Sequence, residues 1–424
     1  MKKTLLLAFI ILFSVVSLSY ALETDTHEVI NEYIVRNILN GFSLNSYLKE
    51  ELNIEEGIEQ LLEKKEIVEW LKEGGKYEDV PPDSAPFIRS VNHFHNPISN
   101  KGFSGFFGTG LFSGESALQW SQKPPETQCP GGYYSWHDVR GYFLKALTSP
   151  AKTERDENFS RTFRGLGQLM HLVQDMSVPA HTRDDGHLFY NYEKWALINI
   201  IDVRKYSQTY FNSSSIGLPN PLAPVPFANL FDTNQYDGAN PDITLRDDIG
   251  LSEYTNANFF SNDTIFKKFP YPDWSSVSEE IEVSELPDPR DPTGKAKRKY
   301  LIKDKHGAFG YRLSRAPYLV KYFDGNISEF IELKLPPVLD DLVYNDYSKC
   351  LIPRAVGYSA GLLGYFFRGK LEVKTVEGGF EITNTSKEIM KNGHFELYYD
   401  REEGNENKEA SLRESITITS GAEV

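Results

Sequence analysis

One segment, from Phe163 to His181, constrains this chain more than any other part of its sequence. Its first part has helical periodicity and places His171 and Asp175 four residues apart, one turn along the same face of a helix. Pro179 ends that helix, because proline lacks a backbone donor and clashes with the preceding turn. His181 can therefore turn back toward the same face. The segment predicts a helix that ends beside a metal site.

The chain contains only two cysteines, Cys129 and Cys350, which lie far apart in the sequence. Two thiols cannot build a disulfide scaffold or a cysteine-rich zinc site. Any metal site must therefore use histidine and carboxylate ligands. In an exported chain the two cysteines could form one disulfide, and two free or buried thiols are the alternative.

The order His171-x3-Asp175-x5-His181, with Pro179 two residues before the last histidine, resembles the signature of a known superfamily. It is the superfamily of zinc-dependent phospholipases C and single-strand-specific nucleases. Its members hold three zinc ions at the bottom of a cleft in an almost wholly helical domain. The resemblance covers residues 22–369, implies a mainly α fold there, and implies further ligands in a fixed order along the chain.

The early ligands of this superfamily have counterparts near the start of the chain. The family's mature N-terminus, normally a tryptophan, binds zinc through its own amine and carbonyl. This implies Leu22 as a ligand, with His27 five residues later. An aspartate and a histidine about fourteen residues apart follow in the family, and Asp79 and His93 have that spacing. The rival carboxylate, Asp83, lies too close to His93 for the family pattern.

The late ligands of the superfamily are another histidine and then a carboxylate, which correspond here to His187 and Glu193. The family usually has three residues between this pair, whereas this chain has five. Asp184 and Asp185 are therefore alternatives to Glu193. Asn191 occupies the position that the strict family spacing would give.

Two other histidines have no counterpart among the family's ligands. His95 alternates with His93 along an extended segment and so points to the other side, where it supports a ligand or is structural. His137 matches no ligand and is expected to be structural. Five of the seven histidines before residue 200 thus correspond to ligands, in the family's order.

The resemblance implies three zinc ions and a division of the ligands among them. Asp79, His93, His171 and Asp175 would hold the first ion, the backbone of Leu22 with His27 and Asp175 the second, and His181, His187 and Glu193 a third, more exposed ion. Zinc held in this way lowers the pKa of water toward neutrality and provides a hydroxide that can attack phosphorus. Asp79 is the candidate to orient or deprotonate that water. This predicts a phospholipase C-like phosphodiesterase that acts on a phospholipid or another phosphodiester.

Two alternatives stay open at this point. A single-strand-specific nuclease of the same superfamily would need aromatic surfaces beside the metals on which bases can stack. A catalytically inactive, surface-binding relative would instead use the C-terminal β segment for recognition. The net charge of -15, from 60 acidic and 45 basic residues, argues against a protein that coats nucleic acid through a broad basic surface. It favours a lipid or a small phosphoester as substrate.

The two ends of the chain differ from its helical centre. Residues 1–21 have a basic start, a short apolar run and small residues up to Ala21, which is typical of a secretory signal peptide. We therefore expect a secreted or periplasmic protein, and a monomer without a membrane span. Residues 370–424 predict either a β appendage or an incomplete β-sandwich, with a hairpin at Gly378. Its strands are expected at residues 371–375, 379–383, 395–399 and 415–419.

Helical periodicity characterises most of the chain between these ends. It predicts helices within the stretch from His27 to Leu71 and over residues 136–147, 159–175, 309–333 and 336–368. Residues 205–247 are rich in proline, asparagine, aspartate and serine and predict a long surface excursion.

Overall fold

The computed structural model of the protein describes residues 24–80, 87–105, 110, 113–129, 133–187, 190–213, 227–261, 277–283, 297–305, 308–315, 338–386, 395–402 and 411–416. The predicted signal peptide and the predicted ligand Leu22 lie outside these residues. The described helices are α2 (Thr24–Arg36), α3 (Leu44–Glu50), η1 (Gly57–Glu59), α4 (Ile67–Tyr77), η2 (Phe87–Asn92), α5 (Ala117–Trp120), α6 (Trp136–Thr148), α7 (Lys152–Asp175), α8 (Pro179–Thr182), α9 (Tyr192–Ile198), α10 (Ile200–Ser207), α11 (Ala228–Phe231), η5 (Pro241–Leu245), α12 (Leu251–Asn258) and α14 (Asp341–Phe366). The described strands are β1 (Leu61–Leu62), β2 (Lys65–Glu66), β3 (Val277–Val283), β4 (Lys297–Lys305), β5 (Ala308–Arg315), β6 (Leu371–Val376), β7 (Gly379–Asn384), β8 (Leu397–Glu402) and β9 (Ser411–Ile416).

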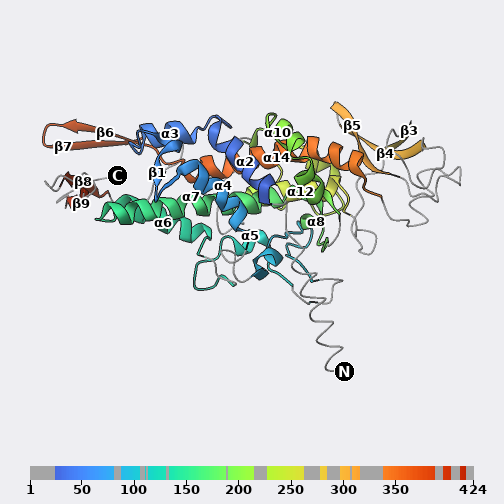
Figure 1. Ribbon diagram of the computed structural model, residues 1–424, viewed down its shortest axis with the longest axis horizontal. Coiled ribbons are helices and arrows are strands. Elements are labelled where there is room, and N and C mark those ends of the chain that lie inside the picture. The colour runs from blue at the N-terminus through green and yellow to red at the C-terminus, as the bar shows by residue number, and fades with distance from the viewer. Residues whose placement is uncertain are drawn as a thin grey trace, which may run out of the picture.

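The long helix α7 lies at the centre of a mainly helical body, with α2, α4, α6 and α14 packed against it (Figure 1). Its apolar side chains Phe163, Leu166, Met170 and Val173 recur every three or four residues and are completely buried. The helix ends at Asp175, and α8 begins at Pro179. The predicted helices α6, α7 and α14 are confirmed, but Pro179 does not itself end α7, which stops four residues earlier, and instead occupies the first position of α8.

A close crossing of α4 and α7 brings the end of α4 to the end of α7. A methyl group on Gly74 would lie 2.2 Å from the carbonyl oxygen of Arg164, and one on Gly167 would lie 2.2 Å from the carbonyl oxygen of Leu71. Only glycine allows the two backbones to approach this closely. The crossing carries Asp79, two residues beyond α4, toward the C-terminal turn of α7.

The stretch from His27 to Leu71 is helical in part. It contains α2, α3 and the beginning of α4, with the short hairpin β1–β2 before α4. Asn40 and Gly41 both have positive φ, 53° and 77°, and form the turn between the first two helices. Helical periodicity therefore predicted helices here correctly, but it did not predict the turn and the hairpin between them.

The helix predicted over residues 309–333 is wrong where the structure describes it. Residues 308–315 form β5, which pairs with β4 in the antiparallel sheet β3-β4-β5. Tyr311 and Leu313 are buried while Arg312 between them is half-buried, so the segment has the two-residue period of a strand. Tyr347 of α14 donates a hydrogen bond to the carbonyl oxygen of Leu313 over 2.6 Å and holds this edge of the sheet to the helices.

The surface excursion predicted over residues 205–247 is also wrong in its middle. Phe227, Leu230 and Phe231 are buried, and the ring of Phe227 lies 4.6 Å from that of Trp136. This apolar cluster is therefore part of the core. Residues 214–226 lie outside the described residues.

The C-terminal region forms two separate two-stranded sheets among the residues that the structure describes. The hairpin β6–β7 is confirmed, with Gly378 at φ 90° in its turn. The strands predicted at 395–399 and 415–419 are displaced, because β8 and β9 pair over 397–402 and 411–416. The β8–β9 hairpin attaches to the start of α7, where the backbone N–H of Arg413 donates to the carbonyl oxygen of Pro150 over 2.8 Å. The hairpin β6–β7 projects beside it (Figure 1).

Two further predictions from the sequence concern membrane-spanning helices and the pairing of the two cysteines. Among the described residues, no helix has the length and apolar character needed to cross a membrane. Cys129 is exposed whereas Cys350 is buried in α14, and the two are not joined in a disulfide.

Candidate metal centre

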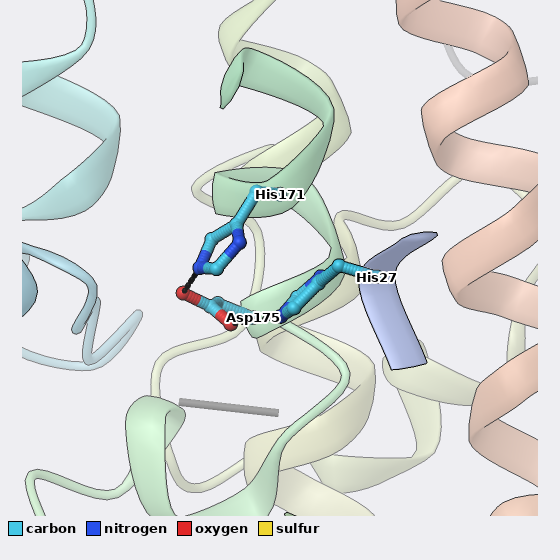
Figure 2. A group of neighbouring side chains, drawn as sticks. All are labelled: His27, His171 and Asp175. Carbon is cyan, nitrogen blue, oxygen red and sulfur yellow. Dashed lines mark ion pairs between the residues drawn. The ribbon is translucent and has the colours of Figure 1, made fainter. Parts of the chain in front are cut away.

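The C-terminal turn of α7 presents His171 and Asp175 on one face, as their spacing predicts. Both side chains are completely buried, and the Nε2 of His171 lies 3.3 Å from the Oδ2 of Asp175. His27, from α2, approaches the same carboxylate from the other side (Figure 2). Three groups of potential metal ligands meet at this point of the molecule, and each is buried.

The first group consists of His27, His171 and Asp175. The rings of His27 and His171 are stacked with centroids 3.7 Å apart, and the Nε2 of His27 lies 3.6 Å from the Oδ1 of Asp175. Figure 2 shows all three side chains converging, two of them from α7 and one from α2. Their ligand atoms lie within 4.8 Å of one another, which is close enough for one ion to contact all three.

The second group consists of Asp79, His93 and His171. The Nδ1 of His93 lies 3.4 Å from the Oδ1 of Asp79 and 3.0 Å from the Oδ2 of Asp175. The Nε2 of His171 lies 3.5 Å from the Oδ2 of Asp79. This second group therefore adjoins the first through His171 and Asp175. The two oxygens of Asp175 face in different directions, Oδ1 toward His27 and Oδ2 toward His93.

The third group consists of His181, His187 and Glu193. The Oε1 of Glu193 lies 3.2 Å from the Nε2 of His181, and its Oε2 is in contact with the Nε2 of His187. On its other face, the ring of His181 stacks on Phe94 at a centroid distance of 4.4 Å. The longer spacing between His187 and Glu193 is accommodated because Glu193 lies in the first turn of α9 and points inward.

Four of the five histidines have one ring nitrogen held by an oxygen acceptor outside the groups. The acceptors of their Nδ1 atoms are Gln174 Oε1 for His27 (2.6 Å), the carbonyl oxygen of Gly75 for His171 (2.6 Å), that of His93 for His181 (3.1 Å) and that of Asp185 for His187 (3.1 Å). A carbonyl oxygen can only accept, so Nδ1 carries a proton, and Nε2 is the nitrogen that offers a lone pair once the ring is neutral. This arrangement is typical of histidines that bind metal through Nε2.

The three carboxylates of the site lack the hydrogen bonds that buried carboxylates normally accept. Neither oxygen of Asp79, Asp175 or Glu193 has a well-aligned donor, although all are buried. The Nε2 atoms of His27, His93 and His187 also have no hydrogen-bond partner, and the contact of His93 Nε2 with Glu78 is an ion-pair distance of 3.5 Å. Buried charged groups that are not hydrogen-bonded are costly unless they coordinate a metal. The set of histidine and carboxylate donors therefore fits metal ions.

The pKa values of these groups follow from burial and mutual charge when no cation is bound. Burial lowers the pKa of His27 to about 3. Burial also disfavours the charged forms of His171 and His181, but neighbouring carboxylates outweigh it and raise the pKa of these rings to about 9 and about 10. Burial raises the pKa of Asp79 to about 6. Protons on histidine thus balance the carboxylates, and a bound cation would have to replace them.

The remaining candidates from the sequence lie outside the three groups. His95 is buried and bonds Ser116 through Nδ1 and Asp232 through Nε2, each over 2.8 Å, as expected of a structural residue. His137 is exposed on α6. Asn191 is the N-cap of α9, where its side chain accepts from the backbone of Lys194.

The alternatives to Asp79 and Glu193 are likewise not in the described groups. Asp184 accepts two hydrogen bonds from Ser104, and the backbone of Asp185 supports His187, while Glu193 itself faces both His181 and His187. Asp83 lies outside the described residues.

Sequence reasoning missed the polar residues that support the ligands. Gln174 accepts from His27 and donates to Asn31 over 2.7 Å. Glu78 is completely buried beside Asp79, where Arg89 and Gln168 both donate to it. The sequence signal that could have identified these residues is their position, since Glu78 adjoins Asp79 and Gln168 lies three residues before His171. Nearness in sequence alone does not show that two side chains are in contact.

Comparison with known proteins adds no relative. No protein-family model, no curated protein and no solved structure matches this chain. The function of the site is therefore inferred from its geometry.

Proposed function

We propose that this protein is a secreted, zinc-dependent phosphodiesterase of the phospholipase C type. The observation that carries the proposal is the position of Asp175, whose two buried oxygens face two different groups of histidines. An acidic side chain in that position is suited to bridge two cations. A ligand set of histidine and carboxylate without cysteine is characteristic of catalytic zinc rather than of closed structural zinc sites.

The side chains of the three groups would then hold three ions, with His171, which belongs to the first two groups, assigned to one ion and Asp175 to two. Asp79, His93, His171 and Asp175 would hold the first, His27 and Asp175 with the backbone of Leu22 the second, and His181, His187 and Glu193 the third. Support for this division comes from the distances within each group, and from the absence of hydrogen bonds to the carboxylates in the described structure.

Zinc ions in these positions would supply Lewis-acid stabilisation of the phosphoryl oxygens and would activate water near neutral pH. The chain's own residues would orient the reactants. Asp79 is the candidate to hold the attacking water, because both its oxygens lack hydrogen bonds and face the histidines of the second group. The aromatic wall of Phe94 and Phe103, with centroids 4.6 Å apart, would limit water around the third group.

Hydrolysis of a chromogenic phosphodiester, with and without a chelator, tests the proposal. We expect turnover that the chelator abolishes and zinc restores. Comparison of phosphatidylcholine with single-stranded DNA then assigns the substrate, and the net charge of -15 leads us to expect the lipid. Preferential cleavage of the DNA would instead assign a nuclease, and a zinc-loaded protein without activity on any of these substrates would be the inactive, surface-binding relative.

A further inference from the structure

Glu78 lies at the C-terminal cap of α4, directly before Asp79, and is completely buried. Arg89 donates to it twice, from Nε to Oε1 over 3.1 Å and from Nη2 to Oε2 over 2.7 Å. Gln168 donates from Nε2 to Oε2 over 2.6 Å. Three separate elements thus fix this carboxylate: α4 carries it, and η2 and α7 supply its donors.

The carboxylate of Glu78 also lies close to the ring of His93. Its Oε1 lies 3.5 Å from the Nε2 of His93, while the Nδ1 of the same ring points to the carboxylates of Asp79 and Asp175. In the other four histidines of the site, an amide or backbone oxygen holds the nitrogen that faces away from the ligands. The Nδ1 of His181 also lies 3.6 Å from Asp175, which is itself a proposed ligand, whereas the carboxylate beside the Nε2 of His93 belongs to none of the three groups.

We propose that Glu78 is a positioning residue that holds the Nε2–H of His93, so that the Nδ1 lone pair faces the metal. The inference rests on the proposed metal site. Contact between a carboxylate and the remote nitrogen of a ligating histidine fixes the ring's orientation and tautomer and makes the histidine a stronger donor.

A purely structural ion pair between Glu78 and Arg89 is the competing explanation. A buried pair is a poor source of stability by itself, because removing both charges from water costs about as much as their attraction returns. Here the charged unit has further fixed partners. The Arg89 guanidinium lies 4.5 Å from the ring of Trp120, and Gln168 lies one turn before His171 on α7. The pair therefore connects the second ligand group to α7, the helix that carries His171 and Asp175.

Zinc titration of the full-length protein tests the proposal. Glu78→Gln should lower the affinity for one of the three zinc ions by about 10- to 100-fold, as the loss of a group that supports a metal ligand commonly does. Glu78→Asp keeps the charge opposite Arg89 but shortens the reach to His93. This variant should therefore fold even if Glu78→Gln does not, and it should show the same loss of zinc affinity. Asp346→Asn is the matched control, since Asp346 is a buried carboxylate paired with Arg312 and Lys349.

A second measurement separates positioning from loss of stability. In ¹⁵N-labelled, zinc-loaded protein, the Nε2–H signal of His93 should move upfield in both Glu78 variants and stay in place in Asp346→Asn. Equal zinc affinity and an unchanged signal in the Glu78 variants would overturn the inference. A zinc-loaded wild type that cleaves no phosphodiester would overturn only the proposed function, whereas a wild type that binds no zinc would overturn both.

Discussion

Replacing Asp175 with asparagine removes the charge that the three ligand groups share. Oδ1 of Asp175 lies 3.6 Å from His27, and Oδ2 lies 3.0 Å from His93, 3.3 Å from His171 and 3.6 Å from His181. An amide has the same shape, but it offers one neutral oxygen and a donor that would face ring nitrogens. We therefore expect the variant to lose two zinc ions of three.

The magnitude can be worked out against a matched variant, Glu193→Gln. Both changes convert a buried carboxylate to its amide, and each breaks buried ion pairs, at a cost of about 3–5 kcal/mol. Glu193 faces only His181 and His187, so its variant should lose one ion. Each bound zinc adds about 2.7 kcal/mol of stability when its free concentration is 100 times its Kd. In zinc, Asp175→Asn should therefore be less stable than Glu193→Gln by about 3 kcal/mol.

The assay is elemental analysis of each purified variant combined with chemical denaturation in zinc and in chelator. We expect the stability difference between the two variants to shrink when chelator replaces zinc, because the extra lost ion no longer contributes. Three zinc ions in Asp175→Asn, or stabilities in zinc that do not differ between the variants, would show that Asp175 is not the bridge.

Three further predictions concern packing, protons and the N-terminus. Gly167→Ala should lower the free energy of unfolding by about 1–3 kcal/mol in a denaturant titration, because the methyl group would lie 2.2 Å from a carbonyl oxygen of α4. Gly141→Ala, with no atom within 4 Å of its added methyl group, should instead raise that free energy by about 0.5–1 kcal/mol, and the same loss in both variants would contradict the close crossing. Zinc binding at neutral pH should release protons, because the raised pKa values of His171 and His181, about 9 and about 10, keep both rings protonated until zinc displaces the proton. Zinc affinity should thus fall as the pH falls, and an affinity independent of pH would refute this. One extra residue before Leu22 should lower the zinc content if the amine of Leu22 is a ligand. Intact-mass analysis would verify the extra residue, and an unchanged zinc content by elemental analysis would remove Leu22 from the site.

The side chains that converge at the site could be predicted because their spacing is a local property. His171 and Asp175 share a face in any α-helix, and Pro179, which begins α8, prevents α7 from continuing unbroken to His181. The order of the remaining histidines followed from a resemblance between sequences, and the structure brings His27, His93, His181 and His187 together with them.

The errors arose where packing decides the conformation of a segment. Residues 309–315 contain Tyr311 and Leu313 with one polar residue between them, a pattern too short to distinguish a strand from part of a helix. Pairing with β4 and contact with Tyr347 of α14 make it a strand. Phe227 to Phe231 belong to a short apolar run whose signal was lost in the polar composition of residues 205–247 as a whole, and the contact with Trp136 identifies them as core.

The sequence by itself determined the helix that presents His171 and Asp175 on one face, because this depends on neighbours within a few residues, and the resemblance supplied the order of the other candidate ligands. The tertiary structure alone decided which distant groups support them. The carboxylate of Glu78 meets Gln168 because Gly74 and Gly167 let α4 and α7 touch, and Gln174 reaches His27 because α2 lies beside α7. Such contacts depend on how helices cross, and the energy of a crossing is spread over many residues that no short motif records.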